Sequence, residues 1–475
     1  MTPSKTNVNE LAEQFNLDDR FIDIKKNLIK PENIEKVTAS WNRLLAAIKV
    51  HFKLIAETGP DYVPKVNFQE IVDNNYQLPN DVAAKFKERG AIMIDDVVDR
   101  DQIDTWFNEL VQFCKDHPET AGYTYPNPTA WYNIFWTKPQ TEARSHPNVQ
   151  KVLNAMSKLF YVNDKSLPID LDSQVVYGDR IRIREPGKNA TLPLHLDSSS
   201  IERWEDNNYS KVYQEIFEGC WEDWDPFKLD ERANAIENLY DDHNVPQPTI
   251  CSAFRTLQGW LALSDNNSGE GTLRVLPNIK LTMAYIMLRP FFWDDSNEEY
   301  HIDLETPKFP GAVPGTGQLF LNDDCFKHLN QFESVVSIPN VKKGSFVFWH
   351  ADIAHEVDKH HNGNGPSSVF YYALTPLSLV NIDTLLEDKY AFLNNKSPKD
   401  YSSQLSEKDR ADEYHGADIK HISNESGLIS MGLTPFNIDE KHLTSGQIKV
   451  RKLANEAITN NKFNAHEYIK THIQF

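Results

Sequence analysis

The stretch PLHLD, residues 193–197, is the starting point for predicting the fold of this chain. It follows a turn and has the pattern of a strand end, where residues two apart point to the same side. His195 and Asp197 could therefore present an imidazole nitrogen and a carboxylate oxygen to one metal ion. A second interpretation is a solvated strand end without a ligand, because a His-x-Asp spacing arises by chance in many chains.

A third metal ligand has to come from another part of the chain. Residues 344–358, GSFVFWHADIAHEVD, offer His350 and His355 after a Gly-Ser-apolar run that is typical of a buried strand. Two histidines and one carboxylate form the facial triad of non-haem Fe(II) oxygenases, which leaves positions on the metal open for other ligands. The residues by themselves do not choose between the two histidines.

The middle of the chain is rich in short β-type segments. They contain many β-branched and aromatic residues, and each is bounded by Gly, Pro, Asn or Asp. Their number and spacing favour an antiparallel sandwich or barrel over alternating βαβ units. These segments are residues 173–187, 249–265, 271–278, 342–350 and 367–376.

The flanking regions have mainly helical or irregular patterns. We expect an N-terminal helical region at 1–85, a β-rich domain at 86–380 and a C-terminal helical or irregular extension at 381–475. Residues 89–96 predict a strand opened by Gly90, and a helix follows. Residues 198–248 are too long for a plain connection and predict a helical insertion or lid.

The composition argues against several classes of protein. The 475 residues include 49 Lys and Arg against 69 Asp and Glu, a formal net charge of −20, which disfavours a broad nucleic-acid or anionic-membrane surface. Four cysteines without a CxxC pair disfavour a disulfide framework or a Cys-rich zinc module. The chain lacks both an 18-residue apolar run and a signal-like apolar segment near its start, so we expect a soluble protein of the reducing cytoplasm.

Taken together, the motifs resemble the phytanoyl-CoA hydroxylase-like branch of the Fe(II)/2-oxoglutarate-dependent dioxygenase superfamily. The resemblance rests on residues 88–110, HLD at 195–197, LQGWLALSDNNSGEGTLRVLPN at 257–278 and FWHADIAHEVD at 348–358. Four further segments are similar to the YbiU-like bacterial and fungal proteins, a family of unknown function within that branch. These are FWTKPQTEARSHP at 135–147, SSSIERW at 198–204, AYIMLRPF at 284–291 and SGLISMGLTPF at 426–436.

The resemblance implies an α+β protein with a double-stranded β-helix (jelly roll) core, N-terminal helices, a helical insertion and a C-terminal extension. It implies Fe(II) held by His195, Asp197 and His355, because the distal ligand of this branch follows the aromatic end of its strand after a short turn. His350 would then line the pocket wall or donate a hydrogen bond behind the ligands.

The resemblance also implies 2-oxoglutarate as a cosubstrate, and here the chain departs from the family pattern. Relatives usually anchor the far carboxylate with Arg or Lys about ten to fifteen residues past the distal histidine, whereas GPSSVFYYAL at 365–374 contains neither. Trp260 matches a tryptophan that lines the cosubstrate site, although a plain core tryptophan fits equally well. Substitute anchors, each of which could instead form a surface or structural ion pair, are Arg182, Arg184, Arg274 and Arg289.

These implications favour an Fe(II)/2-oxoglutarate-dependent oxygenase that hydroxylates a small molecule, without nucleic-acid or membrane partners. The alternative is a cupin-like protein that binds a metal or a carboxylate without turnover, and the missing downstream arginine is its best support. A third interpretation keeps the barrel but uses another divalent metal for hydrolysis or isomerisation.

Overall fold

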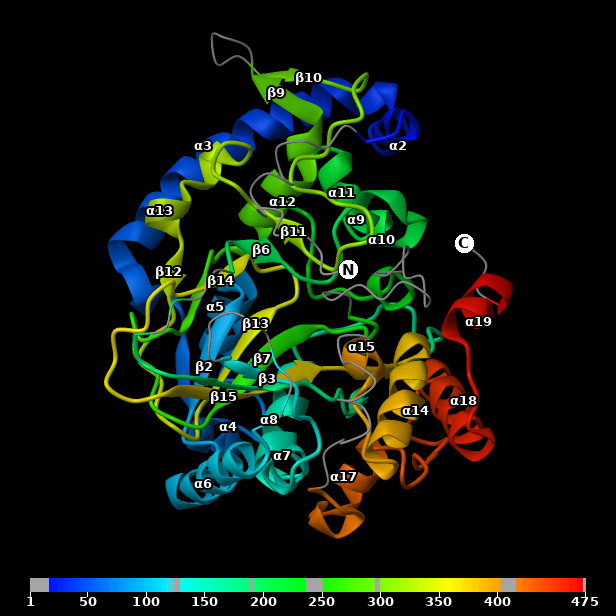
Figure 1. Ribbon diagram of the computed structural model, residues 1–475. Helices are drawn as coiled ribbons and strands as arrows, with labels where there is room; N and C mark the ends of the chain where they lie inside the picture. The colour runs from blue at the N-terminus through cyan, green and yellow to red at the C-terminus, as the bar shows by residue number, and fades with distance from the viewer. Residues whose placement is uncertain are drawn as a thin grey trace.

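The β-rich middle of the chain folds into two main sheets, which lie near the centre of Figure 1. The computed structural model describes residues 17–118, 120, 122, 129–187, 189, 192–235, 251–294, 300–402 and 416–472. Around the sheets lie helices from both ends of the chain, so the fold is mixed α+β.

The larger sheet has seven strands. Its order is β1 (Lys65–Asn67), β2 (Ala91–Asp95), β13 (Phe346–His350), β7 (Leu257–Ala262), β15 (Ser367–Leu374), β5 (Ile181–Arg184) and β3 (Trp131–Tyr132). All neighbours pair antiparallel except β1 and β2, which run parallel. The antiparallel pairing predicted for the β-type segments is therefore confirmed in this sheet.

The second sheet has five antiparallel strands and carries the PLHLD motif. Its order is β11 (Leu319–Phe320), β6 (His195–Leu196), β14 (His355–Val357), β8 (Leu273–Val275) and β12 (Val336–Ser337). Two small antiparallel sheets complete the β structure, β9 (Phe292–Asp294) with β10 (Tyr300–Ile302), and β4 (Ile169–Gln174) with β16 (Pro376–Ser378).

Strand register shows which face of the larger sheet looks toward the smaller one. Trp349 pairs with Gln258, and Tyr371 pairs with Trp260, so these four side chains share one face because side chains alternate along a strand. Gln258 donates a hydrogen bond to Asp197, which directly follows β6 of the smaller sheet. The Gln258 face therefore points inward.

Helices cover the outside of this core. They are α2 (Arg20–Leu28), α3 (Ile34–Thr58), α4 (Phe68–Asp73), α5 (Asn80–Arg89), α6 (Arg100–Asp116), α7 (Lys138–Arg144), α8 (Pro147–Ser157), α9 (Glu202–Glu205), α10 (Asn207–Lys211), α11 (Gln214–Phe217), α12 (Ile279–Leu288), α13 (Gln331–Ser334), α14 (Leu379–Leu393), α15 (Lys399–Ser402), α17 (Glu425–Ser430), α18 (Ser445–Asn460) and α19 (Ala465–His472). Six short 3-10 turns are η1 (Pro31–Asn33), η2 (Gly59–Tyr62), η3 (Arg232–Asn234), η4 (Arg289–Phe291), η5 (Lys327–Leu329) and η6 (Ile419–His421).

The long helix α3 shows how the N-terminal region joins the core. Its helical stripe of apolar residues is buried, and Trp41 stacks on Tyr285 of α12 and on Phe292 of β9 at centroid distances of 5.3 and 4.7 Å. The strand β1 of this region was not predicted from the sequence, because its three residues are too few to show alternation.

Gly90 opens β2 as the sequence predicts. Its φ of 81° lies in the left-handed region, and a Cβ there would collide with Ile353 and Ile279. Both the backbone angle and the close packing therefore require glycine. The following helix, α6, begins after Asp99, whose side chain accepts a hydrogen bond from the backbone N–H of Asp101.

The insertion predicted at 198–248 is described as far as residue 235, and the rest of it lies outside the described residues. Its described part contains α9, α10, α11 and η3, which agrees with a helical insertion. In the C-terminal part, α14, α18 and the small β4–β16 sheet share a separate apolar cluster. The boundaries of the three predicted domains remain predictions.

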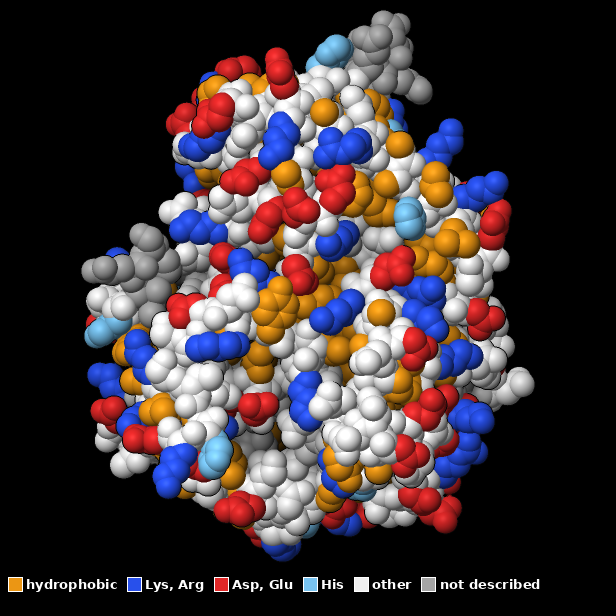
Figure 2. All heavy atoms as spheres, turned by 180° about the vertical axis from the view of Figure 1, so that it is seen from behind, with side chains coloured by type: hydrophobic (Ala, Val, Ile, Leu, Met, Phe, Trp, Pro, Cys, Tyr) orange, Lys and Arg blue, Asp and Glu red, His pale blue; other side chains and the backbone are white. Residues whose placement is uncertain are grey.

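The surface is consistent with the mixed charge of the sequence. Acidic and basic side chains are interspersed over the face seen in Figure 2 rather than gathered into a patch of one sign. Among the described residues, no helix combines the length and apolar character needed to cross a membrane.

Candidate metal centre

The structure brings His195, Asp197 and His355 together. His195 of β6 pairs directly with His355 of β14, and Asp197 follows two residues after His195. One ligand atom from each residue lies within 4.8 Å of the others. Three donors thus converge on one point, although His355 lies far from the other two in sequence.

Hydrogen bonds orient both imidazole rings. Nδ1 of His195 lies 2.8 Å from the carbonyl oxygen of Pro193, and Nδ1 of His355 lies 3.0 Å from that of Ile353. A carbonyl oxygen only accepts, so each Nδ1 carries the proton and donates it. Each Nε2 therefore keeps its lone pair, and these atoms lie 3.5 and 3.3 Å from oxygens of Asp197. Such a donor set fits a divalent metal ion.

Burial and mutual contact set the charge states of the three groups. Burial disfavours ionisation of Asp197, but the two imidazoles outweigh it and hold the carboxyl pKa well below its usual range. Burial together with the nearby His195 lowers the pKa of His355. For His195 burial acts in the same direction, yet the Asp197 carboxylate raises its pKa. An ionised carboxylate between two imidazoles is the charge pattern that attracts a cation.

The turn after Asp197 adopts an unusual backbone conformation. Ser198 and Ser199 have φ values of 64° and 79°, in the left-handed region that residues other than glycine rarely occupy. The hydroxyl of Tyr209 donates to the carbonyl of Ser198 at 2.7 Å, and Arg203 Nη2 donates to the carbonyl of Asp197 at 2.6 Å. The helical insertion therefore holds the backbone around Asp197 in place.

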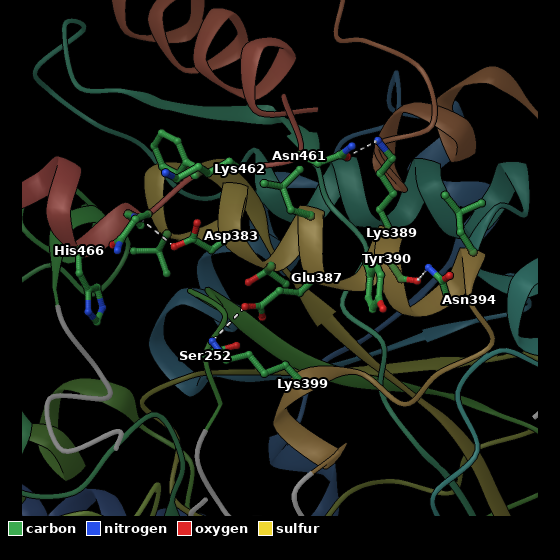
Figure 3. Close-up of a pocket in the computed structure, with 17 residues that line it drawn as sticks. Ser252, Asp383, Glu387, Lys389, Tyr390, Asn394, Lys399, Asn461, Lys462 and His466 are labelled. Carbon is green, nitrogen blue, oxygen red and sulfur yellow. Dashed lines mark hydrogen bonds and ion pairs between the residues drawn. The ribbon is translucent and has the colours of Figure 1, made fainter. Parts of the chain in front are cut away.

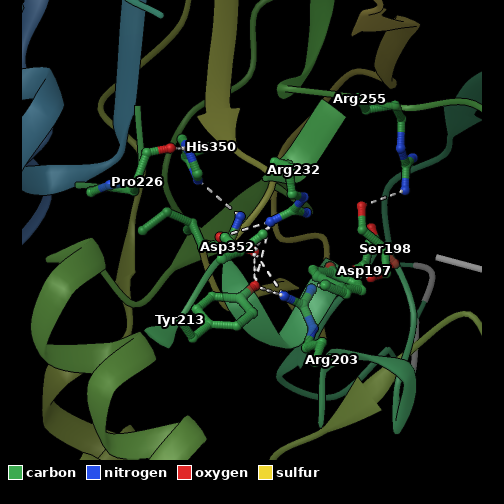
Figure 4. A network of polar contacts seen from close by, with 12 residues as sticks. Asp197, Ser198, Arg203, Tyr213, Pro226, Arg232, Arg255, His350 and Asp352 are labelled. Atoms are coloured by element: carbon green, nitrogen blue, oxygen red, sulfur yellow. Dashed lines mark hydrogen bonds and ion pairs between the residues drawn. The ribbon is translucent and has the colours of Figure 1, made fainter. Parts of the chain in front are cut away.

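A buried ionic network connects this turn to the segment that precedes His355 (Figure 4). Arg203 Nη1 donates to Asp352 Oδ1 at 2.8 Å, and Arg232 Nη1 lies 3.1 Å from both Asp352 oxygens. Asp352 is 1% exposed and lies in the turn between β13 and β14. The network thus joins the strands that carry Asp197 and His355.

His350 does not belong to the donor cluster. Its Nδ1 accepts from the backbone N–H of Asp352 at 3.0 Å, so Nε2 carries the proton and donates to the carbonyl of Pro226 at 3.1 Å. Burial lowers the pKa of His350 to about 4. The side chain packs against both Phe160 and Phe227, where it supports the Asp352 turn rather than facing the cluster.

Three of the residues predicted for the cosubstrate site lie on the inner face of the larger sheet. Register places Trp260, Arg182 and Arg184 on the same side as Gln258. Arg182 is 1% exposed and donates to Ser367 Oγ at 3.0 Å. Arg184 donates to the carbonyls of Asp358 and Lys359 at 2.7 and 3.0 Å, so it holds the loop after β14.

The other two arginines point elsewhere. Arg274 pairs with Glu356 across β8 and β14, on the side opposite to His355. Arg289 donates to the carbonyls of Cys325 and Phe292 and lies over the ring of Trp293. Both therefore have structural contacts apart from the donor cluster.

Sequence reasoning did not find the polar side chains that surround Asp197. Besides Arg203, which in turn is held by Asp352, these are Gln258 and Gln318, whose amides each donate to one Asp197 oxygen. The alternation of β7 offered one signal, because Gln258 lies two residues before Trp260 and so shares its face. The partners of Gln318 could not be inferred from its loop.

A cavity of about 950 Å³ lies apart from the cluster, between α14 and the segment that joins α18 to α19 (Figure 3). In its lining, Lys399 Nζ lies 3.0 Å from Glu387, and Asp383 accepts from the backbone N–H of Ala465 at 2.8 Å. Burial raises the pKa of Glu387 to about 7, although Lys399 opposes this. The carboxylates of this lining are thus engaged in the fold, and no lining residue belongs to the donor cluster.

The fold and the site define a class: an α+β protein with two buried histidines and one partly buried aspartate between mainly antiparallel sheets. Within that class, the chain belongs to the Gig2-like family, whose model matches residues 15–433. It is 29% identical over 329 residues to the uncharacterized protein YbiU of Escherichia coli K12, covering 67% of this chain and 74% of YbiU. The predicted resemblance to YbiU-like proteins is therefore confirmed.

Solved structures agree with this assignment. The product of GlcNAc Inducible Gene 2 from Candida albicans is 59% identical, with a TM-score of 0.89 over 96% of this chain and 98% of that one. A protein from Salmonella typhimurium LT2, provisionally described as an oxidoreductase, is 26% identical, with a TM-score of 0.74 over 88% and 99% of the two chains.

Proposed function

We propose that this protein is an Fe(II)/2-oxoglutarate-dependent oxygenase that hydroxylates a small molecule. The observation that carries the proposal is the donor set itself: His195, Asp197 and His355 offer two imidazole nitrogens and one carboxylate oxygen within 4.8 Å of one another. Three protein ligands of this kind suit ferrous iron and leave positions open for a cosubstrate and dioxygen. The provisional description of the Salmonella relative points in the same direction.

The proposal includes the finer fold prediction. Two antiparallel sheets face each other with the donor set between them, and we assign this arrangement to the double-stranded β-helix (jelly roll) expected from the sequence. Strands hold ligands more rigidly than loops do, which suits a site whose geometry has to persist through a reaction.

The residues of the chain prepare the site. When bound, iron and 2-oxoglutarate supply the oxidising chemistry of this enzyme class. The Nδ1–H groups of both histidines are held by carbonyls, so the Nε2 atoms are oriented before a metal arrives. Aromatic rings of Trp349 and Phe320 lie 5.2 and 6.1 Å from the imidazoles of His355 and His195 and pack against those sides of the site.

Arg182 is the proposed anchor for the far carboxylate of 2-oxoglutarate. It lies on the inner face, its Nε is buried without a hydrogen-bond partner, and its described contacts include no carboxylate. A buried guanidinium in that state gains from a charge-assisted pair with a carboxylate. Trp260 is proposed to line the same space, since its register position lies between those of Gln258 and Arg182.

A second candidate function is binding of a metal or carboxylate without turnover. It is favoured by residues 365–374, which contain no Arg or Lys where relatives place the cosubstrate anchor. Register also places Arg182 level with Ala262, four residues beyond Gln258 on β7, or about 13 Å along the strand. A short dicarboxylate has to bridge that separation for the first function to hold.

One experiment separates the two functions. Under anaerobic conditions the protein is titrated with Fe(II) and then with 2-oxoglutarate, and the visible charge-transfer band of the chelated complex is recorded. We expect the band in the wild type and its loss in His195→Ala, because the latter lacks one ligand. Iron binding without a band would reject 2-oxoglutarate as the cosubstrate and favour the binding protein.

A further inference from the structure

Both carboxylate oxygens of Asp197 accept hydrogen bonds from glutamine amides. Gln258 Nε2 on β7 donates to Oδ2 at 2.7 Å, and Gln318 Nε2 donates to Oδ1 at 2.9 Å. The two donors come from opposite sides, one from the larger sheet and one from the residue before β11 of the smaller sheet. The plane of the carboxylate is therefore fixed by contacts other than the histidines.

Trp349 determines which end of the Gln258 amide faces Asp197. Its indole Nε1–H donates to Gln258 Oε1 at 2.6 Å, and both side chains are buried, with 5% and 6% exposure. An indole N–H can only donate, so it requires the oxygen end of the amide, and the NH₂ end is left to face the carboxylate. A flipped amide would place two acceptors against each other and leave the indole without a partner.

The same tryptophan also contacts the histidine side of the site. Its ring centroid lies 5.2 Å from that of His355, and Trp349 pairs with Gln258 across β13 and β7. One buried side chain thus touches one expected ligand directly and another through Gln258. A change at Trp349 should therefore affect the site without touching Asp197.

The choice of an amide has a physical reason. A lysine or arginine at position 258 would also hold the carboxylate, but its charge would repel a divalent cation a few ångströms away. A neutral donor leaves the full negative charge of Asp197 available to the metal. Because each oxygen is held by one amide, rotation of the carboxylate away from the imidazoles costs these hydrogen bonds.

We infer that Gln258 is a positioning residue of the metal centre: oriented by Trp349, it holds the Asp197 carboxylate in the orientation that faces both imidazoles. This inference rests on the proposed metal centre and adds a consequence to it. Without the Gln258 hydrogen bond the carboxylate is free to turn away from the imidazoles, so a metal ion should bind more weakly and in an altered geometry.

The test measures Co(II) binding to the full chain, both as affinity by calorimetry and as the visible spectrum of the bound ion. In Gln258→Leu we expect affinity to fall about 10- to 100-fold, the range for loss of a hydrogen bond behind a metal ligand. The spectrum should also change in position and intensity, because the freed carboxylate alters the coordination geometry. A purely structural role would lower stability but leave the spectrum of the bound ion unchanged.

Trp349→Phe provides an independent variant that keeps Gln258. We expect a smaller loss of affinity with a spectral change in the same direction. The double variant should lose less affinity than the two single losses combined, because part of the effect of Trp349 passes through Gln258. If Gln258→Leu does not fold, Trp349→Phe alone decides the matter.

Two matched controls remove similar buried hydrogen bonds elsewhere. Gln140 Nε2 donates to the carbonyl of Ile134, and Trp136 Nε1 donates to that of Lys396, each at 2.8 Å. Gln140→Leu and Trp136→Phe should keep wild-type Co(II) affinity and spectrum.

The outcomes distinguish the inference from the proposed function. If the wild type binds no Co(II), the metal centre itself is rejected. If the wild type binds Co(II) but Gln258→Leu and Trp349→Phe match their controls in affinity and spectrum, the positioning role is overturned while the metal centre stands.

Discussion

Replacement of Asp352 by asparagine tests the ionic network that joins the two ligand-bearing segments. The carboxylate is 1% exposed and receives hydrogen bonds from Arg203 at 2.8 Å, from Tyr213 at 3.1 Å and from Arg232 at 3.1 Å on each oxygen. The amide side chain would keep an acceptor and nearly the same shape, but the two guanidinium groups would lose their shared negative charge. Breaking a buried ion pair in this way costs about 3–5 kcal/mol.

The assay is urea unfolding of wild type and Asp352→Asn, with Asp104→Asn as the control. Asp104 pairs with Lys343 at the surface with 49% exposure, so its loss should cost less than about 1 kcal/mol. Asp352→Asn should also bind Co(II) more weakly than the wild type, because its loss of charge frees Arg203, which donates to the Asp197 carbonyl. A loss of stability no larger than that of the control would refute the reasoning.

The effect of pH on this difference follows from the pKa of Asp352. Burial disfavours the carboxylate, but Arg232 and Arg203 outweigh it and hold the pKa well below its usual range. A group with a lowered folded-state pKa contributes stability that is present above its unfolded pKa, about 3.9, and is lost as the pH falls through the folded value. The stability difference should therefore be constant from about pH 5 to about pH 8.

Three further changes have defined outcomes. Burial raises the pKa of Glu202 to about 7, so the folded chain keeps a proton that the unfolded chain releases near pH 4.3, and the stability of the wild type falls between these two pH values. Glu202→Gln should therefore be more stable than wild type by about 1–3 kcal/mol at pH 8 and equal to it near pH 4. An equal gain at both pH values in urea unfolding would contradict this. Co(II) at 100 times its Kd should stabilise the wild type by about 2.7 kcal/mol and so raise its melting temperature. Asp197→Ala should abolish this rise, and a retained rise would place the ion elsewhere. Arg182→Met should weaken 2-oxoglutarate binding to the Fe(II) form at least about 10-fold with unchanged metal affinity, since a charge-assisted pair is lost. The control Arg274→Met should bind 2-oxoglutarate as the wild type does. Equal effects of both changes would reject Arg182 as the anchor.

Local patterns carried much of the prediction. Alternation and turn residues located β5, β7, β13 and β15, and Gly90 marked the start of β2 because only glycine fits its backbone angle and its packing. The spacing of apolar residues likewise predicted a helix where α3 lies. Each of these signals depends only on neighbours within a few residues. The strand β1 was not readable, because its three residues are paired only through β2.

The candidate site divides in the same way. The types of ligand followed from HLD and from FWHADIAHEVD, and the resemblance to the family favoured His355 over His350. The side chains that orient Asp197 did not follow, because Gln258 lies 61 positions from Asp197 in sequence. Hydrogen-bond partners so far apart are determined by the register of strands from two different sheets.

Short stretches of sequence were enough to predict the candidate ligands, the antiparallel strands and the family to which the chain belongs, because the motifs are specific in combination although none is specific alone. Only the tertiary structure showed which arginines face inward and which instead pair with Glu356 or donate to backbone carbonyls. The same holds for Arg203 and Asp352, which are 149 positions apart and buried against each other. Burial and pairing of charges depend on the packing of whole elements, and a local pattern contains no record of that packing.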